Sequence, residues 1–259
     1  MRGRTPPFRV LLNNRVDGVK MEQAIEYLPQ LLQGLVLTVV VTLIVMVLAT
    51  ALGLLVAIGR MSRFALVRGP LTAYVEFVRG TPTLVHLYYV FYVLPLVGVT
   101  LPAVLAGVIG LTIGYAAYLS EVFRAAIGSV PLVQQEAADS LGLSKVQSFR
   151  LVIMPQATRV ALPPTVNYLL SLFKDTSLLS IITIQELMFT GLLIGSMTFQ
   201  YFIIFTEVAI LYFCVCYPWA WLARRLEKRL SPDGGQSTSK RLAKTRRQLF
   251  MSDGMAGQK

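Results

Sequence analysis

Long apolar runs separated by short polar segments dominate the chain. The first run, residues 31–58, contains no charged residue, and it is longer than the about 20 residues that an α-helix needs to cross a bilayer. Four further runs cover residues 70–97, 101–120, 162–196 and 199–222. The pattern predicts an all-α integral membrane protein with five transmembrane helices.

A polar segment, residues 121–160, separates the third run from the fourth. Within it, small and apolar residues recur at helical spacing in two short stretches, 132–141 and 146–153. Gly142 and Ser144 lie between the stretches and supply a helix stop and a new N-cap, and Pro155 is predicted to end the second helix. We therefore expect a helical hairpin at the membrane surface.

The residues of this hairpin support two interpretations. It is either an amphipathic connector in the lipid interface or a docking surface for a protein partner. Ala137 and Ala138 are poor lipid anchors and would offer a smooth surface to a groove, which Glu136 and Asp139 would border. On physical grounds alone the two interpretations are about equal.

The distribution of charge predicts which way the chain faces. Of 24 Lys and Arg residues, ten lie beyond residue 223, and the links after the first and third runs are also basic. The positive-inside rule therefore places these links and the C-terminus in the cytoplasm, and the N-terminus outside. The five basic residues among the first 20 oppose this orientation, although neighbouring acids offset them and translation from Met21 would remove them. Because topology explains the net charge of +11, no nucleic-acid partner is indicated.

Charged residues inside the apolar runs are costly and by default face the interior of a helix bundle. Glu76 and Arg79 are spaced i, i+3 and could pair locally, whereas the adjacent Lys174 and Asp175 point in different directions and could engage Glu76 and Arg79 across the bundle. Such residues either line a path for a zwitterionic solute or form a structural ion-pair network.

Several neighbouring residues complete this candidate path. Thr81 and Pro82 are expected to interrupt the second span, while Thr176 and Ser177 offer hydroxyl groups. His86 fits core packing best, and Glu207 has no partner that the sequence identifies. Glu121 and Arg124 are expected to pair at a helix end. The candidate path residues are Glu76, Arg79, Thr81, Pro82, His86, Lys174, Asp175, Thr176 and Ser177.

No catalytic or metal-binding pattern accompanies these features. The chain contains neither the G-x-x-x-x-G-K-[ST] phosphate loop nor a G-x-S-x-G nucleophile motif. Its single histidine and its two cysteines, Cys214 and Cys216, lack the spacing of a metal site. We therefore expect no enzymatic activity and no cofactor held by this chain.

The hairpin sequence QQEAADSLGLSKVQSFRLVIMPQA, residues 134–157, resembles the EAA loop of ABC importer permeases. Its flanks, RGTPTLVHLYYVFYVLP (79–95), GYAAYLSEVFRAAIGSVP (114–131) and LPPTVNYLLSLFKDTSLLS (162–180), are similar to permeases for polar amino acids of the histidine/glutamine type. The resemblance runs from residue 28 to residue 229. Two positions depart from the family: Val133-Gln134 replaces the usual Gly-Gln, and His86 replaces a frequent Gln.

This resemblance implies a type I ABC importer permease fold in the bacterial inner membrane, with a permease domain over residues 28–230. Residues 1–27 would form an extracytoplasmic extension and residues 231–259 a basic, disordered cytoplasmic tail. The coupling residues that contact the ATPase would be Glu136, Ala137, Ala138, Asp139, Gly142 and Pro155.

The implied function is import of polar or charged amino acids, or opine-like derivatives. The implied partners are two ATP-binding subunits, which bind the ATP, a second permease chain that is identical or paralogous, and an extracytoplasmic solute-binding protein. Two alternatives stay open: a stand-alone secondary transporter, for which no internal repeat is visible, and a membrane-anchored assembly protein. Dependence of transport on ATP rather than on an ion gradient separates the three.

Overall fold

The computed structural model describes residues 21–230, and the expectations for residues 1–20 and for the tail 231–259 lie outside this part. Within it the chain is helical and contains no strand. The elements, in order, are α2 (Met21–Arg60), α3 (Ala65–Gly80), α4 (Thr83–Tyr88), the π-helix η1 (Tyr89–Val93), the 3₁₀ helix η2 (Leu94–Val97), α5 (Ala103–Gly128), α6 (Leu132–Ser140), α7 (Lys145–Ser148), the π-helix η3 (Phe149–Ile153), α8 (Met154–Asp175), the 3₁₀ helix η4 (Thr176–Ile182), α9 (Leu187–Thr198) and α10 (Tyr201–Leu230).

Three helices of the described part, α2, α5 and α10, are long and apolar enough to cross a membrane alone. The other two predicted spans are bent. The second bends by 108° between α3 and the segment from α4 to η2, and the fourth bends by 49° before α9. The chain therefore has up to five spans if each bent pair crosses once, so an all-helical membrane protein is confirmed and the count of five stays a prediction.

The bend in the second span lies where the sequence predicts an interruption. α3 ends at Gly80, Thr81 and Pro82 are extended, and α4 begins at Thr83. Proline fixes its own φ angle and pushes the residue before it out of the helical region. The predicted interruption of the second span at Thr81 and Pro82 is confirmed.

The prediction for Pro155 is wrong. The second hairpin helix does not end there, because α7 continues through the π-helix η3 directly into α8. Pro155 lies in the first turn of α8 directly after the π-helix η3, and this irregular turn accommodates a residue that has no N–H to donate. As a result, α7, η3 and α8 join the hairpin to the fourth span as one continuous helical segment.

α5 is the central helix of the bundle. Its apolar window is 61% buried, against 33% for α2 and 11% for α10. α2 packs along α5 at a close approach at Gly53, where an added Cβ would lie 3.0 Å from the carbonyl oxygen of Ala116. Small residues at such crossings let membrane helices pack backbone to backbone. The main core joins α2, α5, the end of α8 and η4, and includes Val45, Leu111 and Leu179.

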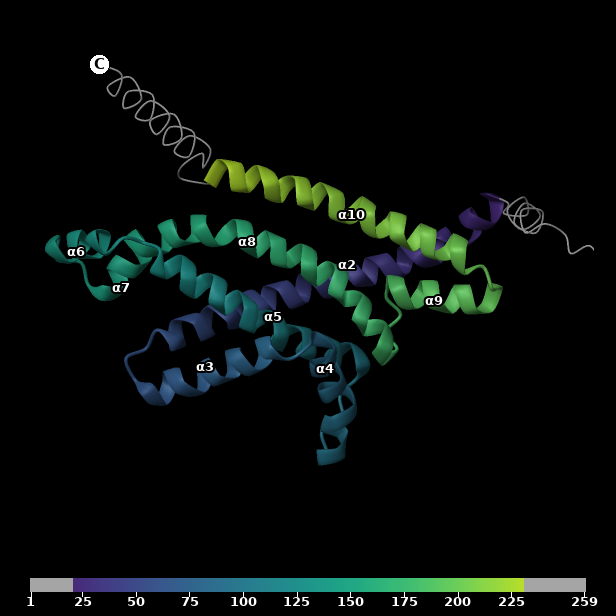
Figure 1. Cartoon of the computed structure of the whole chain (residues 1–259), viewed down its shortest axis with the longest axis horizontal. Coiled ribbons are helices and arrows are strands. Elements are labelled where there is room, and N and C mark those ends of the chain that lie inside the picture. The colour runs from purple at the N-terminus through teal and green to yellow at the C-terminus, as the bar shows by residue number, and fades with distance from the viewer. Residues whose placement is uncertain (1–20, 231–259) are drawn as a thin grey trace, which may run out of the picture.

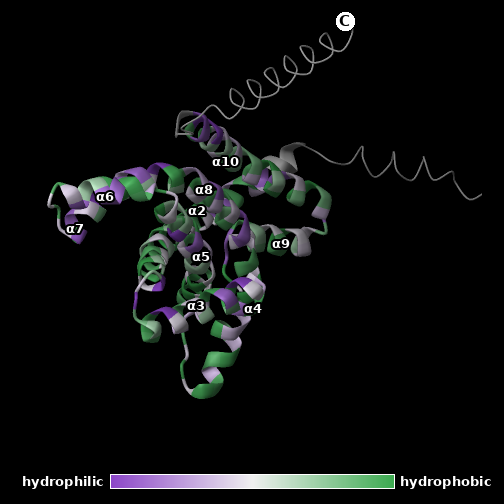
Figure 2. Ribbon diagram, turned by 60° about the vertical axis from the view of Figure 1, so that its left-hand side comes forward, coloured by the Kyte–Doolittle hydropathy of each residue, from purple (hydrophilic) through white to green (hydrophobic). Residues whose placement is uncertain are grey.

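The basic segments gather at one end of the molecule. Figure 1 shows the α2–α3 link, the α6–α7 hairpin and the last turns of α10 at one end, with the start of α2, α9 and the start of α10 at the other. In Figure 2, hydrophilic residues are concentrated on α6, α7 and the end of α10. The links that the positive-inside rule places on one side therefore share one end of the fold.

Candidate functional site

The turn of the α6–α7 hairpin is built by the residues that the sequence identifies. Gly142 takes a left-handed conformation, with φ of +72°, after Leu141, the C-cap of α6. Ser144 then starts α7 with a capping box: its Oγ accepts a hydrogen bond from the backbone N–H of Gln147, and its own N–H donates to Gln147 Oε1 at 2.9 Å. The predicted helix stop and N-cap are confirmed.

The hairpin presents an apolar and acidic surface to its surroundings. Leu132, Leu141 and Val146 are 67–80% exposed, and the Glu136 and Asp139 side chains are also exposed. Exposed leucines and valines that lie close together are typical of a docking surface.

The two alanines of the hairpin do not act together as the sequence suggests. Ala137 is exposed, but Ala138 is only 2% exposed. Ala138 therefore packs inside the hairpin, where a small side chain lets α6 lie close to the segment behind it, and it cannot form part of the outer surface. The hairpin is also tied to α8 by a hydrogen bond of 3.4 Å from Gln156 Nε2 to Gln134 Oε1.

The path residues of the second span form a local hydrogen bond beside the helix break. Thr81 Oγ1 lies 2.5 Å from His86 Nε2, and the His86 side chain is buried. Thr81 comes from the extended break and His86 from α4, so this contact fixes the bend. The burial of His86 agrees with the packing role that the sequence favours, and His86 also has a polar partner in Thr81.

A cluster of three tyrosines, Tyr115, Tyr118 and Tyr168, joins α5 to α8. The rings of Tyr118 and Tyr168 stack with centroids 5.8 Å apart, and the Tyr115 ring meets Tyr168 edge-on at 6.4 Å. The Tyr115 hydroxyl donates a 2.8 Å hydrogen bond to Asp175 Oδ2, and the Arg79 guanidinium lies 5.9 Å from the Tyr118 ring centroid. The tyrosine cluster thus contacts an anion through Tyr115 and lies near a cation at Tyr118.

Arg79 does not pair with Glu76 or with Asp175. Its nearest carboxylate is Glu121, at 3.9 Å, and Glu121 also binds Arg60 at 2.7 Å and Arg124. The expected pair of Glu121 with Arg124 is confirmed, but Glu121 joins three helices rather than closing one. The long Arg79 side chain reaches from α3 to Glu121 on the neighbouring helix α5. Spacing along the sequence relates only residues of one helix, so it suggests the wrong partner for Arg79.

The remaining path residues are not gathered into one contact. In the described part, neither Glu76 nor Lys174 lies within ion-pair distance of an opposite charge, and both are exposed. Thr176 is fully buried and its hydroxyl donates to the carbonyl oxygen of Phe173 at 2.7 Å, whereas Ser177 is half-buried. Thr176 therefore stabilises the junction between α8 and η4.

Sequence reasoning misses two features of this region. The tyrosines carry a signal that could have been read, because Tyr115 and Tyr118 are spaced i, i+3 on α5 and Tyr168 lies seven residues before Asp175 on α8. Glu186 is also missed. Its side chain is fully buried at the start of α9. Because Glu186 lies inside the fourth apolar run, the rule applied to Lys174 and Asp175 could have identified it.

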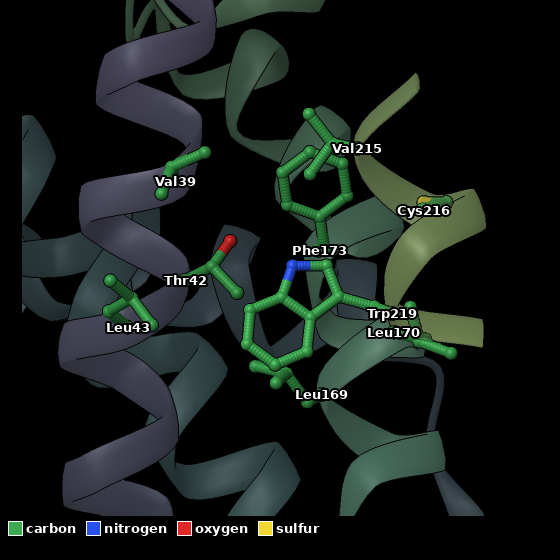
Figure 3. A pocket seen from close by; sticks show the side chains of 9 residues that line it. All are labelled: Val39, Thr42, Leu43, Leu169, Leu170, Phe173, Val215, Cys216 and Trp219. Atoms are coloured by element: carbon green, nitrogen blue, oxygen red, sulfur yellow. The ribbon is translucent and has the colours of Figure 1, made fainter. Parts of the chain in front are cut away.

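Two cavities in the described part are too apolar to suit a charged solute. Figure 3 shows a cavity of about 80 Å³ between α2, α8 and α10, where Thr42 and Trp219 are the polar groups among aliphatic side chains, Phe173 and Cys216. A second cavity, of about 210 Å³ between α2, α5 and α8, is similarly apolar. No cluster of three or more His, Cys, Asp or Glu side chains that could hold a metal occurs among residues 21–230.

Comparison with known proteins matches most of the described chain to one family. The family of the "Binding-protein-dependent transport system inner membrane component" matches residues 49–232. "Probable amino-acid ABC transporter permease protein YckA" of Bacillus subtilis is 40% identical over 206 residues, which cover 80% of this chain and 91% of that protein. "L-cystine transport system permease protein TcyB" of the same organism is 37% identical, with 78% and 87% covered.

Solved structures agree with the fold. A chain from the "Crystal structure of an amino acid ABC transporter with histidines" superimposes with a TM-score of 0.76 at 32% identity, covering 82% of this chain and 99% of that one. A chain of the MetNI methionine ABC transporter in an inward-facing conformation superimposes with a TM-score of 0.61 at 19% identity, which shows likeness of fold alone.

Proposed function

The chain belongs to the family of inner-membrane components of binding-protein-dependent transport systems, and on that premise we propose that it imports polar or charged amino acids. It is the permease of an ABC importer, a transport component without an ATP-binding domain of its own. Such a permease works with an ATPase, a binding protein and a second permease chain. Membership of this family argues against the stand-alone transporter and the assembly protein.

The substrate class rests on the relatives and on the tyrosine cluster. Relatives named as amino-acid and cystine permeases are 37–40% identical to this chain. A zwitterionic amino acid needs an anion for its ammonium and a cation for its carboxylate. Asp175, bonded to Tyr115, and Arg79, near the Tyr118 ring, supply these at the cluster, and aromatic faces attract an ammonium group. Opine-like derivatives carry the same charged groups.

The orientation follows from charge and from the shared end of the fold. The hairpin, the α2–α3 link and the end of α10 would face the cytoplasm of a bacterial inner membrane, and the start of α2 would face outside. In this orientation the hairpin meets the ATPase. The assembly would contain two permease chains, identical or paralogous, and two ATPase subunits.

The exposed hairpin is the observation that carries the coupling role. Leu132, Leu141 and Val146 would enter a groove of the ATPase, with Glu136 and Asp139 at the border. ATP would close the ATPase dimer, and the motion would pass from the hairpin through the continuous segment α7, η3 and α8 to the tyrosine cluster. Gly142 would set the turn of the hairpin and Pro155 would start α8, so both would shape the coupling element.

Co-purification with the ATPase tests the coupling role. Glu136→Lys reverses a charge on the docking surface and is expected to lose the ATPase during isolation in mild detergent. Glu227→Lys is the matched control, because it makes the same charge change on an exposed residue of α10 at the same end of the molecule. The proposal fails if wild-type chain is isolated without an ATPase, or if both variants lose it equally.

Uptake by the complete transporter tests the path. Asp175→Asn removes the anion, and Tyr115→Phe removes its hydrogen bond, so both are expected to lower amino-acid uptake at unchanged assembly with the ATPase. Tyr92→Phe serves as the control, since the Tyr92 hydroxyl is exposed and makes only a long hydrogen bond of 3.4 Å to the Ile181 carbonyl. Normal uptake by the Asp175→Asn variant would show that the Asp175 carboxylate has no role in the transport path.

A further inference from the structure

The fourth span breaks before α9, and the first four N–H groups of α9 all have hydrogen-bond partners. A break inside a membrane exposes N–H groups that lipid cannot solvate. The N–H groups of Met188 and Phe189 donate to the Glu186 carboxylate at 2.9 and 2.8 Å, and that of Leu187 donates to Thr38 Oγ1 at 3.1 Å. The N–H of Thr190 donates to the Glu186 carbonyl at 2.9 Å. Four consecutive N–H groups are thus accounted for.

Glu186 also ties three helices together. Its carboxylate accepts a hydrogen bond of 3.2 Å from the Tyr212 hydroxyl of α10. It lies 3.4 Å from Thr38 Oγ1 of α2, although that hydroxyl is nearer to the Gly34 carbonyl, at 3.0 Å. Glu186 and Thr38 are both fully buried. Among residues 21–230, the carboxylate therefore holds α9 against α10 and α2 without an ion pair, through N–H and O–H groups.

Tyr212, the partner of Glu186 on α10, also contacts the end of α8. The Tyr212 ring packs edge-on against Phe173, with centroids 5.5 Å apart. Phe173 is buried and lies two residues before Asp175, the acid bound to Tyr115. A chain of contacts consequently runs from Glu186 through Tyr212 and Phe173 to the tyrosine cluster.

We propose that Glu186 is a positioning residue of the transport path, which holds Tyr212 against Phe173 and so fixes the end of α8 that carries Asp175. This inference rests on the proposed function of the tyrosine cluster. A helix cap alone would need only the Met188 and Phe189 contacts. The added bond to Tyr212 is what connects the cap to the path.

Glu186→Gln and Tyr212→Phe test this role in the complete transporter, reconstituted with its ATPase and binding protein. Glu186→Gln keeps the size of the side chain but replaces one acceptor oxygen with a donor. Transport at saturating binding protein is expected to fall about tenfold, with fewer substrate molecules moved per ATP hydrolysed. Tyr212→Phe removes one hydrogen bond and is expected to lower transport about threefold. The double variant should be no worse than Glu186→Gln, because the two residues act in one chain of contacts.

Glu207→Gln is the matched control. Glu207 also lies on α10, but in the described part its carboxylate oxygens are buried without a hydrogen-bond partner. The same chemical change there is expected to leave the number of substrate molecules moved per ATP unchanged. A fall of equal size in Glu207→Gln would overturn the inference, because the effect would then follow from any buried acid in this region.

The thermal stability of the assembled complex distinguishes positioning from capping alone. If Glu186→Gln and Tyr212→Phe lower the melting temperature while transport per assembled complex and per ATP stays normal, Glu186 only caps α9 and the inference is wrong. If Glu186→Gln does not assemble, Tyr212→Phe decides, since it leaves both backbone contacts of the cap in place. Wild-type complex that moves no amino acid with ATP would instead refute the proposed function.

Discussion

The three-way ion pair of Glu121 allows a quantitative prediction. Glu121→Gln removes the charge that Arg60, Arg79 and Arg124 share while nearly preserving side-chain shape. Arg60 is the critical partner, because its side chain is only 10% exposed and its Nε has no hydrogen-bond partner in the described part. Arg79 and Arg124 are 43–44% exposed and water can solvate them.

The expected cost follows from this difference in burial. Leaving a buried charge without its partner costs about 3–5 kcal/mol, whereas exposed pairs contribute about 0–1 kcal/mol. Since Glu121 is itself 27% exposed, we expect a loss near the lower end, about 3 kcal/mol. For a chain of this size that corresponds to a fall in melting temperature of about 6–12 °C.

Thermal unfolding of the purified transporter measures this loss, and a double-mutant cycle identifies its cause. Arg124→Ala is the control and should cost less than about 1 kcal/mol. Arg60→Met removes the buried charge, so the double variant Glu121→Gln/Arg60→Met should recover about 2 kcal/mol of the loss. If the double variant is as unstable as the sum of the two single changes, the unpaired Arg60 is not the cause and the reasoning is refuted.

Two further predictions concern close packing and the hairpin. Gly34→Ala would place a Cβ 2.8 Å from Thr190 Oγ1 and 3.1 Å from the Glu186 backbone, so we expect a loss of about 1–3 kcal/mol by thermal unfolding, whereas Gly69→Ala, which meets nothing within 4 Å, should not destabilise. Ser144→Ala removes the capping box with Gln147 and should cost about 1 kcal/mol locally, seen as faster amide exchange in α7 only; unchanged exchange there would contradict the role of the cap.

The features that were predictable from the sequence depend on local rules. The break at Thr81 and Pro82, the turn at Gly142 and the N-cap at Ser144 each follow from the conformational preference of the residue itself. Pro155 shows the limit of such rules. A proline is compatible both with the end of one helix and with the first turn of the next. Here the π-helix η3 precedes Pro155, which lies in the first turn of α8.

The features that were not predictable depend on contacts between distant segments. Arg79 meets Glu121 rather than Glu76, because α3 packs beside α5 and the long side chain reaches across. Glu186 has its partners Thr38 and Tyr212 on two other helices, so no spacing in the sequence relates them. The exposed face of the hairpin was predictable as amphipathic, but the burial of Ala138 depends on how its two helices pack.

Transport by the reconstituted complex tests the central claim most directly. The chain, its ATPase and its binding protein would be placed in proteoliposomes, and uptake of labelled polar amino acids would be measured with ATP, with a non-hydrolysable analogue, and with ion gradients alone. We predict uptake that requires ATP hydrolysis and the binding protein, and that Glu136→Lys abolishes. Uptake driven by an ion gradient without ATP, or by this chain alone, would contradict the account.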